Sequence, residues 1–80
     1  MVTFDPEADA TYVRVSAAEV VATRTVGELL SVDLDADGAP VGVELLKAPG
    51  AVTADDEAVV VAHYPSLGEA FDALRRTVTV

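Results

Sequence analysis

The sequence predicts an α+β fold: a single small antiparallel β-sheet of about five to six strands, arranged as hairpins or a meander, packed by one C-terminal α-helix. Valine is the commonest residue, with 15 of the 80 positions, and its branched Cβ favours strands. Apolar and polar residues alternate on both sides of Asp37-Gly38, as in a hairpin. The end of the chain instead repeats its apolar residues at helical spacing.

The first two strands form a predicted hairpin. Val2 to Phe4 is a short apolar run, and Pro6 sets the backbone angle needed in the turn that follows. In Ala10 to Val15, residues 11, 13 and 15 share one face and residues 10, 12 and 14 share the other. Val20 to Val26 is rich in β-branched residues and is the expected third strand.

The segment from Leu29 to Leu46 gives the clearest hairpin prediction. A two-residue type I′ loop at Asp37-Gly38 needs positive φ at both residues. It would pair apolar residues across the two strands, all on one face: Leu34 with Val41, Val32 with Val43, and Leu30 with Leu45. A slip of one residue would put apolar side chains in water.

The rest of the chain completes one domain, residues 1–80, after a β core at 1–48. We expect an exposed acidic loop at 49–57 and a strand at Ala58 to His63, since the latter contains three consecutive valines. Ser66 and Glu69 fit a capping box that starts a helix. The apolar stripe of that helix would be Leu67, Ala70, Phe71, Leu74 and Val78.

Charge and composition limit the possible partners. The chain carries 14 acidic and 5 basic residues, a formal net charge of −9, so nucleic acid and anionic membranes are not expected to bind it directly. It has no cysteine, no apolar run long enough to cross a bilayer and no signal-like start. We therefore expect a cytoplasmic protein.

Two stretches of the chain have a distinctive order of residues: the opening Phe4-Asp5-Pro6-Glu7-Ala8-Asp9-Ala10-Thr11-Tyr12, and the hairpin with Asp33, Asp35, Asp37-Gly38 and Val41-Gly42-Val43-Glu44. Together they resemble a known family of short bacterial proteins, domain of unknown function 2283. Phe4 stands where the family usually has tyrosine, and Thr11 where it has a larger apolar residue. The resemblance implies a mostly-β fold without an established activity. Some relatives are encoded beside small ribonuclease-type toxins, which implies an antitoxin-like role for those members.

The hairpin also contains a calcium-binding pattern. Asp33, Asp35, Asp37 and Glu44 have the spacing of EF-hand ligands, with Gly38 at the sixth position. An EF-hand loop lies between helices, whereas the alternation here is that of strands. Weak divalent-cation binding by these four residues remains as an alternative.

No nucleophile, base and orienting group can be assembled from these residues, so we expect no catalytic residue and no cofactor. The favoured hypothesis is a small non-enzymatic interaction module or homo-oligomer. Its partner would be a protein with a basic surface, bound by an acidic face of Asp33, Asp35 and Glu44. An alternative, implied by the family resemblance, is an antitoxin-like role with a small basic ribonuclease-type toxin as the partner. The competing hypothesis is a small enzyme, which requires the carboxylates of Asp5 to Asp9 and of the hairpin to converge in one concave site.

Overall fold

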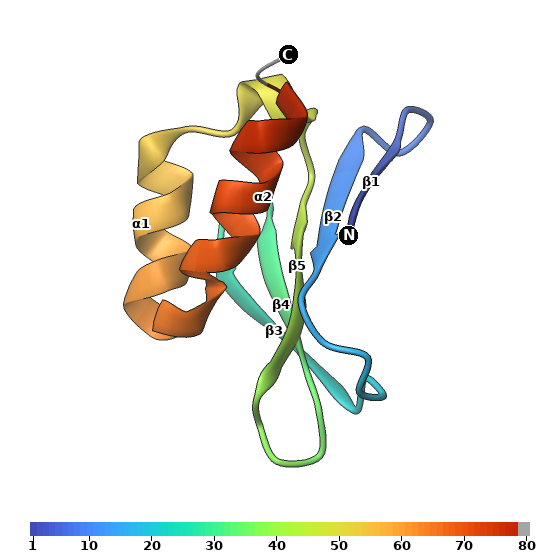
Figure 1. Ribbon diagram of the computed structural model, residues 1–80, viewed down its shortest axis with the longest axis vertical. Helices are drawn as coiled ribbons and strands as arrows, with labels where there is room; N and C mark the ends of the chain where they lie inside the picture. Colours follow the sequence, from blue (N-terminus) through green and yellow to red (C-terminus); the bar gives the residue numbers. More distant parts are fainter. Residues whose placement is uncertain (79–80) are drawn as a thin grey trace.

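A computed structural model describes residues 1–78 of the chain and shows a five-stranded antiparallel sheet with two helices (Figure 1). The α+β class is therefore confirmed. The strands are β1 (Val2–Asp5), β2 (Ala10–Arg14), β3 (Ala22–Gly27), β4 (Leu30–Leu34) and β5 (Pro40–Leu45). The helices are η1 (Pro49–Ala51), α1 (Ala54–His63), η2 (Pro65–Leu67) and α2 (Gly68–Val78), where η denotes a single 3₁₀ turn.

The strand order is β1-β2-β5-β4-β3. The first hairpin and the third strand are confirmed, but only β3, β4 and β5 form a meander. The β1–β2 hairpin joins the sheet through β2, which pairs with β5 and not with β3. This long-range pairing leaves β1 and β3 as the two edges.

The β4–β5 hairpin is confirmed, with a different turn. Leu30 lies opposite Leu45 and Val32 opposite Val43, as predicted, but Leu34 lies opposite Pro40 because the register shifts after Asp33. Within the turn, the Asp35 amide donates to the Ala39 carbonyl, and only Gly38 has positive φ, at 81°. The loop is thus longer than a type I′ turn and ends in a glycine bulge.

The prediction of a strand at residues 58–63 is wrong, because this segment belongs to α1. Thr53 begins the helix with a capping box: its hydroxyl accepts from the Asp56 amide, and the Asp56 carboxylate accepts from the Thr53 amide. The acidic residues expected in a loop instead occupy the first helical turn, where the helix dipole favours negative charge. These local bonds outweigh the β-propensity of three valines.

The predicted C-terminal helix is confirmed as α2, but Ser66 does not begin it. Ser66 lies inside η2, which has no side-chain cap, and the capping box of the chain is at Thr53. Four residues of the predicted stripe are buried: Leu67, Ala70, Phe71 and Leu74. The side chain of Val78 and the last two residues of the predicted segment lie outside the described part of the chain.

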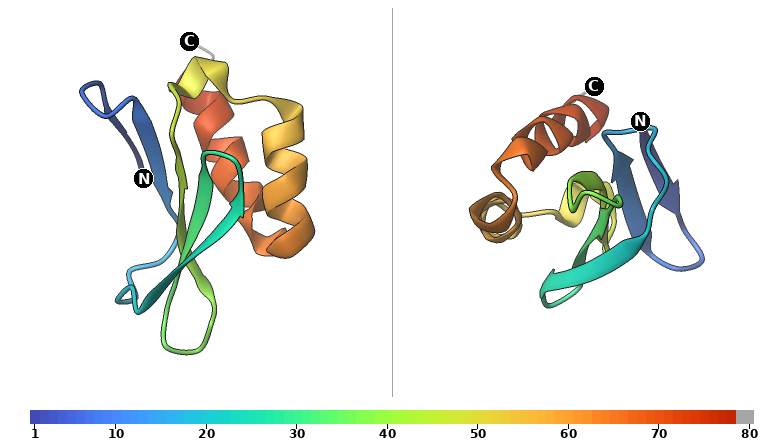
Figure 2. Two further views of the ribbon diagram at one scale, coloured as in Figure 1. Left: turned by 180° about the vertical axis from the view of Figure 1, so that it is seen from behind. Right: turned by 90° about the horizontal axis from the view of Figure 1, so that it is seen from below.

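The core lies between one face of the sheet and the helices. Figure 2 shows α1 and α2 on the same side of the twisted sheet. Helix α1 contacts β3 and β4, and α2 contacts β1 and β2. The buried apolar side chains of the sheet face these helices: Val13, Leu30, Val32, Val43 and Leu45. The opposite face of the sheet is left open.

Candidate interaction face

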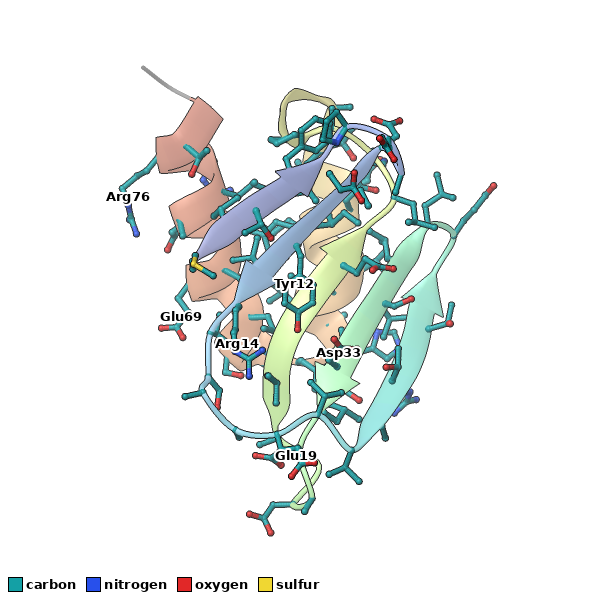
Figure 3. All side chains as sticks on the ribbon, turned by 90° about the vertical axis from the view of Figure 1, so that its right-hand side faces the viewer. Tyr12, Arg14, Glu19, Asp33, Glu69 and Arg76 are labelled. Atoms are coloured by element: carbon teal, nitrogen blue, oxygen red, sulfur yellow. The ribbon has the colours of Figure 1, made fainter. Side chains whose placement is uncertain are left out.

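The open side of the sheet, here called the outer face, carries mostly polar residues, and all five strands contribute to it. Strand pairing places them in two rows. The first row is Thr3, Tyr12, Glu44, Ser31 and Thr25, and the second is Arg14, Gly42, Asp33 and Thr23. Figure 3 views this face directly.

Tyr12 crosses the outer face from β2 to β4. Its hydroxyl donates to Oδ2 of Asp33 over 2.9 Å, passing over Gly42 of the intervening strand β5 (Figure 3). A Cβ on Gly42 would lie 2.3 Å from the Tyr12 hydroxyl oxygen and 2.8 Å from the Val13 carbonyl oxygen. A glycine at this position is therefore what lets the ring lie against the sheet.

Asp33 connects three strands. Besides the Tyr12 bond to Oδ2, its Oδ1 accepts from the Thr23 hydroxyl of β3 over 2.7 Å. Burial of Tyr12, reinforced by the hydrogen bond to Asp33 and the negative charge of that carboxylate, raises the pKa of the Tyr12 phenol from 10.0 to about 12. The phenol therefore stays a neutral donor at physiological pH.

The structure separates the predicted interaction residues. Asp33 and Glu44 lie on the outer face, and Glu44 is exposed. Asp35 lies in the β4–β5 turn, where its Oδ1 accepts from the amides of Asp37 and Ala39 at 2.9 Å each. Asp35 therefore stabilises the turn. Of the three predicted interaction residues, Glu44 is the exposed one.

Arg14 forms one border of the outer face. Its guanidinium donates to the carbonyls of Ser16 and Ala18 at 2.7 and 2.9 Å, which holds the segment leading to β3. Arg14 lies near Tyr12 in Figure 3. The outer face thus combines hydrogen-bonded, ordered groups with the exposed carboxylate of Glu44.

The candidate metal and catalytic residues do not converge. The turn that contains Asp5 and Asp9 and the β4–β5 turn lie at opposite ends of the sheet (Figure 1), and Asp5 accepts from the amides of Glu7 and Ala8. Within residues 1–78, no three acidic or histidine side chains are grouped to hold a metal ion. Weak cation binding by the hairpin stays a prediction.

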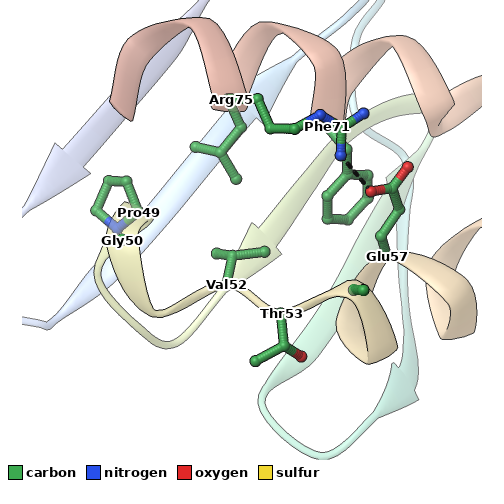
Figure 4. A pocket seen from close by; sticks show the side chains of 9 residues that line it. Pro49, Gly50, Val52, Thr53, Glu57, Phe71 and Arg75 are labelled. Atoms are coloured by element: carbon green, nitrogen blue, oxygen red, sulfur yellow. Dashed lines mark hydrogen bonds and ion pairs between the residues drawn. The ribbon is translucent and has the colours of Figure 1, made fainter. Parts of the chain in front are cut away.

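A separate groove of about 300 Å³ opens between α2 and the segment from Pro49 to Glu57 (Figure 4). Phe71, Leu74 and Val52 contribute its apolar lining. At its rim, Arg75 Nη1 lies 2.5 Å from Oε1 of Glu57, and Arg75 also contacts Asp72. The charged groups of the groove are therefore already paired with one another.

Comparison with known proteins identifies the family. The model of the family "protein of unknown function (DUF2283)" matches residues 1–48. The chain belongs to this family. No curated protein and no solved structure matches it.

The matched region contains all five strands and the whole outer face. At Thr11, where the resemblance leads one to expect a larger apolar residue, the side chain is buried and its hydroxyl donates to the Lys47 carbonyl over 2.7 Å. In the part of the chain described, no helix is long and apolar enough to cross a membrane.

Reasoning from the sequence missed the roles of Tyr12, Gly42 and Thr23. A signal for Gly42 was present, because a glycine inside an alternating strand pattern often marks the close approach of another group. Nothing local connects Tyr12 to Asp33, since the link depends on β5 lying between their strands.

Proposed function

We propose that this protein is a non-enzymatic interaction module whose outer face binds a basic surface of another protein. One observation carries the proposal: Tyr12, Asp33, Gly42 and Glu44, which belong to the motifs of the family resemblance, meet on the face that the helices leave open. A role in folding alone would not require an exposed carboxylate beside the bonded groups.

The outer face is ordered before any partner arrives. The Tyr12–Asp33–Thr23 bonds fix side chains that would otherwise lose conformational freedom on binding. Tyrosine also offers a large flat contact area at low entropic cost, and it is enriched at protein interfaces. The partner would pack on the Tyr12 ring and pair a lysine or arginine with Glu44.

The net charge supports a basic partner. Only three of the fourteen acidic side chains, Asp56, Glu57 and Asp72, form ion pairs within residues 1–78. The resulting field attracts positive surfaces and raises association rates. The antitoxin-like role implied for some relatives would be one case of this function, with a small basic ribonuclease-type toxin as the partner.

The test is affinity capture from native lysate at low salt with matched charge reversals. Glu44→Lys alters the outer face, and Glu69→Lys makes the same charge change at an exposed position of α2. We expect the unmodified protein and Glu69→Lys to retain one basic partner, and Glu44→Lys to lose it. The complex should dissociate near 0.5 M salt, where the Debye length is below about 5 Å.

Comparison of the two variants separates a specific face from general charge. If both reversals weaken capture equally, binding follows net charge alone and the outer face is not the site. Capture that persists in Glu44→Lys would also refute the proposal.

A further inference from the structure

One face of the Tyr12 ring is free to contact a partner. The ring extends from β2 across β5, and its inner face lies over Gly42, where a side chain would overlap it. Figure 3 shows the ring on the open side of the sheet, with no helix in front of it. Tyr12 is partly buried for this reason. The outward face of the ring is therefore a flat aromatic surface, held in place by the hydroxyl bond to Asp33.

Two carboxylates border this ring. Glu44 lies directly opposite Tyr12 in the β2–β5 pairing, and the Cβ atoms of such pairs are about 5 Å apart. Asp33 accepts from the ring hydroxyl over 2.9 Å, so its negative charge is held at the far end of the ring. Glu44 is exposed and forms no ion pair within residues 1–78. A cation that lies over the ring therefore has Glu44 beside it and Asp33 at the hydroxyl end.

Arg14, which lies near Tyr12 in Figure 3, does not supply this cation. Its guanidinium donates to the carbonyls of Ser16 and Ala18, which turns it toward the segment after β2. The positive charge of Arg14 opposes an incoming cation. However, the two carboxylates that border the ring exceed it, and Glu44 lies in the other row of the outer face. The charge around the ring is therefore complementary to a cation that approaches beside Glu44.

We infer that the group bound on the Tyr12 ring is an arginine side chain of the partner protein. Its guanidinium stacks on the outward face of the ring and donates to the carboxylate of Glu44. This inference rests on the function proposed above, because it uses the same face of the sheet. It adds the type of residue that the face selects.

Arginine suits this surface better than lysine. A guanidinium is planar and weakly hydrated, so it stacks on an aromatic ring while the N–H groups at its edge donate to a carboxylate. An ammonium is compact and strongly hydrated, and it must give up more water to contact the ring. In addition, the Tyr12 hydroxyl donates to the Asp33 carboxylate, which leaves the ring richer in electrons and more attractive to a cation.

Matched peptides test the preference for arginine. The probes are Gly-Ser-Arg-Ser-Gly, capped at both ends, and the same peptide with lysine or with citrulline, the neutral analogue of arginine, in the middle. Each is titrated into the isotope-labelled protein at low salt, and the amide shifts of Tyr12 and Glu44 give the dissociation constant. We expect the arginine peptide to bind about three-fold more tightly than the lysine peptide, the gain that an exposed cation–π contact provides. The citrulline peptide should bind most weakly.

Substitutions on the outer face assign the preference to the ring. Tyr12→Leu should bind the arginine and lysine peptides equally, whereas Tyr12→Phe, which keeps the ring, should still prefer arginine. Glu44→Gln should weaken the binding of both charged peptides. Glu69→Gln removes the same charge from an exposed position of α2 and should leave both affinities unchanged. The comparison of peptides on the unmodified protein needs no variant, so the inference can be refuted even if Tyr12→Leu does not fold.

The shifts separate failure of the inference from failure of the proposed function. Equal affinity for the arginine and lysine peptides, with shifts around Tyr12 and Glu44, would overturn the choice of arginine and leave the proposed function intact. A preference for arginine that persists in Tyr12→Leu would also overturn the inference. Shifts of both charged peptides that are spread over the acidic turns or confined to the helices would refute the proposed function as well.

Discussion

At the scale of single residues, Gly42 determines whether Tyr12 can cross β5. We predict that Gly42→Ala destabilises the protein by about 3 kcal/mol, because the new Cβ would overlap the Tyr12 ring and the Val13 carbonyl. Urea unfolding measures the change.

Gly50→Ala is the matched control for this substitution. A Cβ on Gly50 meets no atom within 4 Å, so its effect should stay within about 0.5 kcal/mol. The double variant Tyr12→Ala/Gly42→Ala also removes the tyrosine ring. It should recover only part of the stability lost in Gly42→Ala, since the new Cβ would still lie too close to the Val13 carbonyl. Equal stability of the two single alanine variants would contradict the packing described.

The Tyr12 phenol gives a second residue-scale prediction. Its pKa is raised to about 12 in the folded protein, so the unfolded chain releases this proton first, at about pH 10. Between these values the folded state holds more protons, and the free energy of unfolding should fall as pH rises from about 10 to 12.

Tyrosinate absorbance in a Tyr64→Phe background, where Tyr12 is the remaining tyrosine, reports this titration. Asp33→Asn should lower the midpoint, because it removes the negative charge that opposes ionisation. A midpoint near 10 in the folded protein with Asp33 present would show that the Tyr12–Asp33 bond is absent in solution.

At the scale of elements, the beginning of α1 depends on Thr53. We predict that Thr53→Ala costs about 1 kcal/mol of stability, because it removes the hydroxyl that caps the helix. Ser66→Ala should change stability by less than about 0.5 kcal/mol, since Ser66 provides no cap. Chemical unfolding of the two variants checks the assignment, and a larger loss for Ser66→Ala would refute it.

The pH dependence of this cap follows from Asp56. Burial alone would raise the Asp56 pKa, but the bonds from Lys47 and Thr53 outweigh it and hold the pKa below its ordinary value. The stabilisation is therefore complete above the ordinary pKa and is lost as pH falls through the lowered value. The difference in the free energy of unfolding between Thr53→Ala and the unmodified protein should therefore become smaller at acidic pH.

The β core could be predicted because its signals are local. The turn at Pro6 and the alternation around Asp37-Gly38 define strands whose buried faces are confirmed by Val32, Val43 and Leu45. The register near the turn could not be predicted, because Asp-Gly suits both a two-residue loop and a longer loop with a glycine bulge.

Helix α1 was missed although its signals are local: the three valines favour a strand, and the cap at Thr53 and the acidic first turn, which select the helix, outweigh them. Other features give no such local signal. Leu29 has a φ of 64° in the turn between β3 and β4, a conformation that leucine rarely adopts and no neighbouring residue signals. Likewise, the outer face depends on β2 pairing with β5, a contact between distant segments.

At the scale of the whole molecule, the two faces of the sheet have different roles. The helices cover one face and provide the core, whereas Tyr12 and Asp33 order the other. The charge of −9 favours a basic partner for the outer face in the function proposed above.

The most direct test of the central claim, that the outer face is the binding surface, is a nuclear magnetic resonance map of the labelled protein with its captured basic partner. We expect amide shift changes in the central strands β2, β5 and β4, strongest around Tyr12 and Glu44, with little change in α1 and α2. Changes concentrated on the helices or the groove beside Phe71, with the outer face unaffected, would contradict it.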